Sequence, residues 1–148
     1  MKKFLLLIIS VCFISVLQAQ NPVTWTFTAK KIDSKTYEIN LIAIIDDEWH
    51  LYSQKTPDGG PSATEVVFAN NPLVKFDGGV KEVGEMEEHF EPLFGVKVRQ
   101  YSEKVSFVQV VKLKAAAKTN VSGSVSFMTC NDVQCIPTKK QAFSIKLN

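Results

Sequence analysis

The chain has 148 residues, of which 45% are hydrophobic and 22% charged, and its formal net charge is +2 at pH 7. Two of the 17 basic residues, Lys2 and Lys3, lie in an apparent leader, and the other 15 balance the 15 acidic residues. A near-neutral chain of this length fits one domain with one core, and its charge argues against binding of nucleic acid or an anionic membrane surface.

The first residues have the pattern of a secretory signal peptide. A basic start is followed by an apolar stretch over residues 4–17, and Ala19 precedes a polar residue. We expect residues 1–19 to be the signal peptide and residues 20–148 the exported domain. The apolar stretch is short for a membrane span, so no membrane insertion is expected once the signal is removed. The expected location is periplasmic or secreted, where disulfides form and persist.

Alternation of apolar and polar residues predicts short strands along the rest of the chain. Asp, Asn, Gly and Pro mark the turns between them, most strongly at residues 56–61, and a break is also predicted at Gly78-Gly79. We read a further turn at residues 101–103, between one strand near Val96 and Val98 and another over residues 105–113. The other predicted strands cover residues 23–29, 37–45, 49–52, 64–68, 73–76, 121–127 and 143–147.

The acidic segment over residues 82–95 has no clear period and is predicted to be a loop. It nevertheless holds large apolar residues, among them Leu93 and Phe94. Exposing such side chains costs free energy unless they cover something, so they either shield a site or cap one end of the core.

Cys130 and Cys135 are the two cysteines of the expected exported domain, and four residues including Asn131 and Asp132 separate them. A turn of that length brings two cysteines within disulfide distance. Closing so short a loop stabilises the fold by only about 2 kcal/mol, which makes the bond a poor staple and favours a reactive pair. The spacing also fits a structural disulfide, or a copper site made by the cysteines and a histidine.

Some eight or nine short strands with turns at roughly ten-residue spacing predict an all-β fold, an antiparallel β-sandwich. An immunoglobulin-like topology is favoured, and periodicity alone does not separate it from a jelly roll.

With these features the chain resembles the amino-terminal periplasmic domain of DsbD, a family that carries reducing equivalents across the inner membrane of bacteria. The likeness lies in residues 45–52 (IDDEWHLY), in residues 91–95 (EPLFG), in the strand that leads into Cys130, and in Cys135 with the Ile-Pro that follows it. The resemblance implies an immunoglobulin-like sandwich whose cysteine pair, at one end, passes electrons by thiol-disulfide exchange.

The resemblance also implies roles for individual residues. Cys135 would bond to the partner and Cys130 would resolve the mixed disulfide. Separately from the resemblance, we expect no metal and no cofactor. Leu93 or Phe94 would cap the cysteines, and Glu91 would be an acidic neighbour able to raise a thiol pKa. His50 and Tyr52 would lie beside the pair.

The expected partner is a thioredoxin-fold protein or a DsbD-like membrane redox protein. The family domain has one more residue between its cysteines, and its full-length proteins continue into membrane-embedded and thioredoxin-like domains. We therefore expect this chain to exchange electrons with a separate protein, as a component of a protein-disulfide reductase; whether it is an enzyme itself stays open. The rival hypothesis is a non-catalytic sandwich that binds a protein or glycan and keeps its disulfide as a staple.

Overall fold

The computed structural model describes residues 21–147, and the predicted signal peptide lies outside them. The described residues form eight strands, all paired antiparallel, and contain no helix long and apolar enough to cross a membrane. The strands are β1 (Val23–Lys31), β2 (Thr36–Ile45), β3 (His50–Tyr52), β4 (Glu65–Phe68), β5 (Val74–Glu91), β6 (Val96–Leu113), β7 (Thr119–Cys130) and β8 (Cys135–Leu147).

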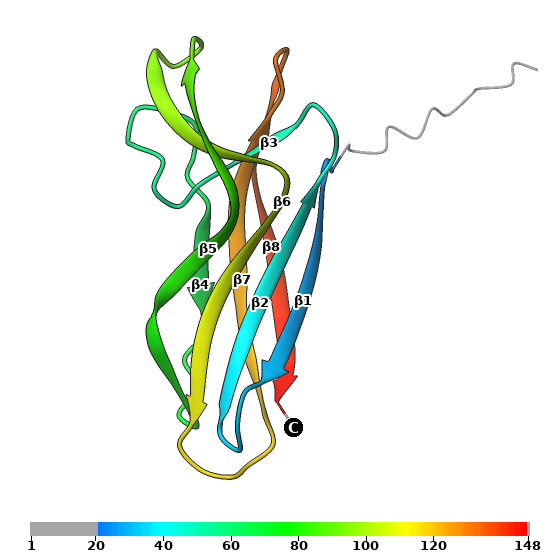
Figure 1. Ribbon diagram of the computed structural model, residues 1–148, viewed down its shortest axis with the longest axis vertical. Coiled ribbons are helices and arrows are strands. Elements are labelled where there is room, and N and C mark those ends of the chain that lie inside the picture. Colours follow the sequence, from blue (N-terminus) through cyan, green and yellow to red (C-terminus); the bar gives the residue numbers. More distant parts are fainter. Residues whose placement is uncertain (1–20, 148) are drawn as a thin grey trace, which may run out of the picture.

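The sheet curls into two layers that enclose the core (Figure 1). One layer contains β1, β2, β6 and β5, and the other contains β4, β7 and β8. The short strand β3 joins them, because Leu51 pairs with Tyr101 of β6 on one side and with Thr129 of β7 on the other. The predicted antiparallel β-sandwich is therefore confirmed.

The core follows from the predicted alternation. In β2 the side chains of Tyr37, Ile39, Leu41, Ala43 and Ile45 are all buried, and in β8 the buried Phe143, Ile145 and Leu147 alternate with exposed residues. A second, smaller cluster made by Tyr52, Val98 and Cys130 lies apart from this main core. The cysteine end of the molecule thus has a packing unit of its own.

The prediction of a loop over residues 82–95 is wrong. Strand β5 continues to Glu91, and only residues 92–95 form the turn into β6. Every residue from Val83 to Phe90 is exposed, because β5 is an edge strand that pairs only with β6, and the tip of the β5–β6 hairpin extends past the sandwich (Figure 1). A strand without a buried face has no reason to alternate, so its sequence lacks the period that would have revealed it.

The breaks predicted at Gly78-Gly79 and at residues 101–103 are also wrong, since both strands continue through them. Each site is instead a shift of register in the β5–β6 pairing, between Asp77 and Lys81 and between Gly84 and Met86. Gly78 has a φ of 70°, and the buried Gln109 side chain donates to the carbonyl oxygens of Asp77 and Gly78 at 3.0 and 3.3 Å. Bulges carry the same turn-type residues as loops do, which explains the misreading.

Candidate redox site

The two cysteines face one another where β7 ends and β8 begins. They are cross-strand partners, their Cα atoms are 4.0 Å apart, and a disulfide joins them. The four-residue turn between them is held by Asn131, whose side-chain oxygen accepts the backbone N–H groups of Val133 and Gln134 at 3.0 and 2.8 Å. An Asn at the first position favours this turn, so the local sequence itself brings the sulfurs together.

The two cysteines differ in exposure. Cys130 is only 2% exposed and packs in the cluster with Tyr52 and Val98, whereas Cys135 is partly exposed at the edge of that cluster. An incoming thiolate must reach the sulfur that it attacks along the axis of the disulfide. Cys135 is thus the more accessible of the two residues.

Strand β3 places His50 and Tyr52 beside the pair. His50 is the cross-strand partner of Cys130, and its Nδ1 lies 3.1 Å from the Ser102 hydroxyl. Tyr52 is fully buried against Cys130, and its hydroxyl has no hydrogen-bond partner among residues 21–147. Burial, and secondarily the negative charge of Glu91, raise the pKa of Tyr52 far above its usual value. The phenol therefore remains neutral beside the disulfide.

The tip of the β5–β6 hairpin lies across from the cysteines. The carbonyl oxygen of Glu91 accepts the backbone N–H groups of Phe94 and Gly95 at 3.2 and 2.8 Å, and Gly95 takes the left-handed φ of 69° that closes this tight turn. Leu93 is 71% exposed and Phe94 is 36% exposed. Neither side chain is packed into the sandwich, so both are available to make contact with something else.

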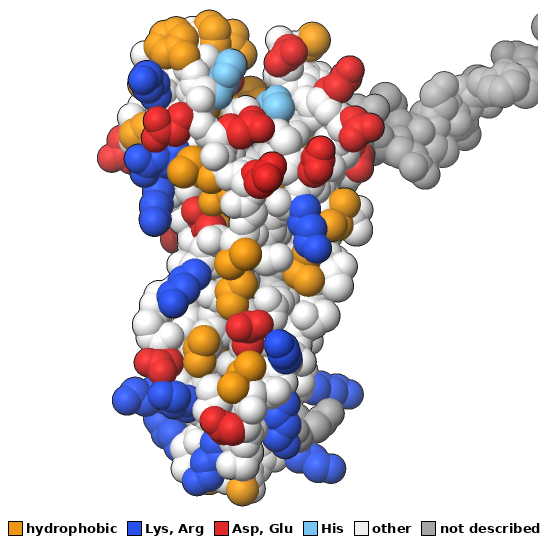
Figure 2. Space-filling view, in the orientation of Figure 1, with side chains coloured by type: hydrophobic (Ala, Val, Ile, Leu, Met, Phe, Trp, Pro, Cys, Tyr) orange, Lys and Arg blue, Asp and Glu red, His pale blue; other side chains and the backbone are white. Residues whose placement is uncertain are grey.

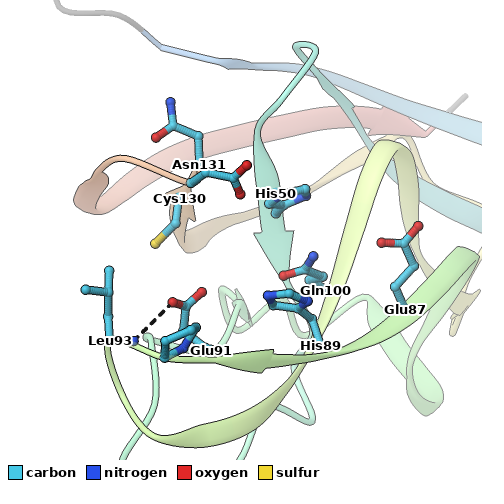
Figure 3. Close-up of a pocket in the computed structure, with 10 residues that line it drawn as sticks. His50, Glu87, His89, Glu91, Leu93, Gln100, Cys130 and Asn131 are labelled. Carbon is cyan, nitrogen blue, oxygen red and sulfur yellow. Dashed lines mark hydrogen bonds between the residues drawn. The ribbon is translucent and has the colours of Figure 1, made fainter.

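A cavity of about 490 Å³ separates the two hairpin tips (Figure 3). Leu93 and Glu91 lie on one side of the cavity and Cys130 lies on the other. His50 of β3, His89 of β5 and Gln100 of β6 complete the lining next to them. The residues that line it are His50, Glu87, His89, Glu91, Pro92, Leu93, Gln100, Cys130, Asn131 and Asp132.

The structure brings most of the predicted site residues together. Cys130, His50, Glu91 and Leu93 line the cavity, whereas Tyr52 and Cys135 do not line it and pack in the small cluster with Cys130. Phe94 does not line the cavity. The roles that the resemblance implies for these residues remain predictions.

Sequence reasoning missed six lining residues, namely Glu87, His89, Pro92, Gln100, Asn131 and Asp132. Glu87, His89 and Pro92 lie in the segment predicted to be a loop, and Asn131 and Asp132 were predicted only as turn residues. Gln100 is a neutral side chain on a strand, and no sequence signal distinguishes it. The copper alternative gains no support, because the described residues contain no group of three His, Cys, Asp or Glu side chains arranged to hold a metal ion.

Comparison with known proteins agrees with the resemblance. The family model for the N-terminal part of the thiol:disulfide interchange protein DsbD matches residues 16–147. The search of curated proteins found no match to the chain.

Solved structures with the same fold include N-terminal domains of this kind. The Neisseria meningitidis DsbD N-terminal domain in its reduced form has a TM-score of 0.59 and 16% identity, over 86% of each chain. The N-terminal periplasmic domain of ScsB from Proteus mirabilis has a TM-score of 0.57 and 16% identity, over 88% of this chain and 48% of that one. A third match, from a complex between the DsbD and PilB N-terminal domains of Neisseria meningitidis, has a TM-score of 0.54 and 13% identity, over 88% and 87% of the two chains. The fold is thus the immunoglobulin-like sandwich predicted from the sequence.

Proposed function

The chain belongs to the family of N-terminal domains of the thiol:disulfide interchange protein DsbD, and on that premise we propose that Cys130 and Cys135 are its redox-active pair. The observation that carries the proposal is their placement. The disulfide lies at one end of the sandwich, beside an open cavity, with one cysteine buried and the other partly exposed. A bond that served only as a staple would need neither the cavity nor the difference in exposure.

The exchange follows from the difference in exposure. In the reduced domain the Cys135 thiolate attacks a sulfur of the partner's disulfide, forms a mixed disulfide and releases the partner's other sulfur as a thiolate. The Cys130 thiolate then attacks the Cys135 sulfur and releases the partner's remaining thiolate. Two electrons pass to the partner, which takes up two protons as its thiolates are protonated. Reduction of the domain by a dithiol partner is the same sequence in reverse.

Neighbouring side chains would control access and reactivity. Leu93 is the better candidate for a cap than Phe94, since Leu93 lines the cavity opposite Cys130. The carboxylate of Glu91 would raise the pKa of a nearby thiol by repelling the thiolate. His50 would orient the strand beside Cys130 through its contact with Ser102.

The proposed partner is a thioredoxin-fold protein or a DsbD-like membrane redox protein. A DsbD N-terminal domain of the same fold has been solved in a complex with the PilB N-terminal domain, so this fold docks a second protein domain. We place the exchange in the periplasm, after cleavage of residues 1–19, with residues 20–148 as the working domain. In that setting the chain would act as a component of a protein-disulfide reductase.

A trapping experiment tests the proposal. The Cys130→Ala variant keeps the exposed sulfur and loses the resolving one, so it should accumulate a mixed disulfide with a thioredoxin-fold partner on a non-reducing gel. The matched Cys135→Ala variant should trap far less, since its remaining sulfur is buried. Equal trapping by both variants, or none by either, would contradict the assigned roles.

A further inference from the structure

Acidic side chains gather around the cavity at the cysteine end of the molecule. Figure 2 shows them surrounding the two histidines, which are the cavity-lining His50 and His89. Glu87, Glu91 and Asp132 line the cavity itself, and the residues that line it include no lysine or arginine. The cavity therefore has negative charges with no cation of its own to balance them.

A buried side chain in the same cavity also lacks a partner. Gln100 is 4% exposed, and its oxygen Oε1 has no hydrogen-bond partner within the described part of the chain. Figure 3 shows its amide in the middle of the lining residues. A buried carbonyl oxygen without a hydrogen bond costs free energy, so a site that retains one is suited to a ligand that brings an N–H donor.

The charges and the free acceptor identify the class of ligand. Carboxylates and an amide oxygen accept hydrogen bonds from an ammonium or guanidinium group, which also neutralises the charge. A metal ion fits less well, because no three potential ligands among residues 21–147 are grouped to hold one. A volume of about 490 Å³ lies within the usual range of binding sites for small groups.

We infer that this cavity receives a lysine or arginine side chain of the redox partner, beside the partner's reactive cysteine. The inference rests on the proposed function, and it adds a feature by which the domain would select its redox partner. Glu91 lies beside Leu93 and across the cavity from Cys130, so a cation bound to Glu91 faces the cysteine side of the cavity (Figure 3). A thioredoxin-fold protein with a basic residue next to its active-site cysteine would be preferred to one with an acidic residue there.

Three small disulfides with the same two-carbon arms test this selection. Cystamine carries two ammonium groups, 2-hydroxyethyl disulfide is neutral, and 3,3′-dithiodipropionate carries two carboxylates. The rate at which each oxidises the reduced domain at low salt is divided by its rate with 2-mercaptoethanol, which corrects for intrinsic reactivity. We expect the corrected rate for cystamine to exceed that for the neutral reagent by about fivefold, and the anionic reagent to be slowest.

Variants locate the effect within the cavity. Glu91→Gln and Asp132→Asn should each reduce the ratio of cystamine to neutral reagent, and the double variant should bring it near one. Glu88→Gln is the matched control, since Glu88 lies on the same strand, is 54% exposed, pairs with Arg99 at 3.2 Å and does not line the cavity. The Glu88→Gln variant should keep the preference for cystamine over the neutral reagent. The ratio of reagents cancels any change in thiol reactivity, because the same thiolate attacks both.

The outcomes separate this inference from the proposed function. Equal corrected rates for all three reagents, or equal losses in Glu88→Gln and Glu91→Gln, would overturn the cation site while leaving thiol-disulfide exchange intact. Failure of every reagent to oxidise the dithiol would overturn the exchange instead.

A titration without redox chemistry then decides the cation site. Ethylguanidinium added to the disulfide form should shift the Gln100 side-chain amide resonances saturably. The shift should be weaker in the Glu91→Gln, Asp132→Asn double variant, and its absence in the unmodified domain would overturn the site.

Discussion

Removing the hydroxyl group from either of two buried tyrosines should change the free energy of unfolding, and the two changes should have opposite signs. Tyr52 is fully buried, and its hydroxyl has no partner in the described structure. Tyr101 is 3% exposed, and its hydroxyl donates to Glu82 at 3.0 Å. A buried hydroxyl without a hydrogen bond costs about 1–3 kcal/mol, whereas a hydrogen bond to a carboxylate contributes about 1.5–3 kcal/mol. We therefore expect Tyr52→Phe to raise the free energy of unfolding by about 1 kcal/mol and Tyr101→Phe to lower it by about 1.5 kcal/mol.

Urea unfolding of the disulfide-bonded domain measures the difference. The two variants remove the same atom, so effects on the unfolded chain cancel in the comparison. Glu82 keeps its bonds from the Ser53 hydroxyl and the Gln54 backbone, both 2.7 Å, so the loss in Tyr101→Phe is confined to one contact. A decrease in stability for Tyr52→Phe as large as that for Tyr101→Phe would refute the reasoning.

Further predictions concern pH, packing and the cap. Burial, followed by the charge and hydrogen bond of Glu82, raises the pKa of Tyr101 to about 12, and the pKa of Tyr52 is raised further. Tyrosine in the unfolded chain ionises at about pH 10, so the free energy of unfolding should fall as the pH rises above that value. The fall should be less steep in Tyr52→Phe, which lacks one of the two raised pKa values. A flat profile from about pH 10 to about pH 12 would contradict this. Gly123→Ala should destabilise by about 3 kcal/mol or more in thermal unfolding, because its Cβ would lie 2.2 Å from the carbonyl oxygen of Val67. Leu93→Ala should change stability by less than about 0.5 kcal/mol yet speed the reaction of the pair with a small disulfide; an unchanged rate would argue against Leu93 as the cap.

Local sequence was sufficient to predict strand β2 and the β7–β8 hairpin, where apolar side chains alternate onto one buried face. The alternation in residues 143–147 and the turn residues after Cys130 predicted both the β7–β8 hairpin and the approach of the two sulfurs. These features depend on neighbours in the chain, which a single sequence records directly.

Features that depend on distant contacts were not predictable in this way. Strand β5 has no buried face over residues 83–90, and the bulges in its pairing with β6 carry residues that also suit turns. The cavity arises because β3 brings two hairpin tips to one end of the fold, a consequence of long-range pairing. Gln100 was missed for the same reason, since only the folded chain shows that its oxygen is buried without a partner.

The redox potential of the Cys130–Cys135 pair tests the central claim most directly. It is measured by equilibrating the domain with defined ratios of reduced and oxidised dithiothreitol or glutathione and counting free thiols. A domain that exchanges electrons with thioredoxin-fold partners should have a potential above about −300 mV, near the range of thioredoxin-like proteins. A potential well below about −300 mV, typical of structural disulfides, would contradict the account and leave a binding sandwich held by a staple.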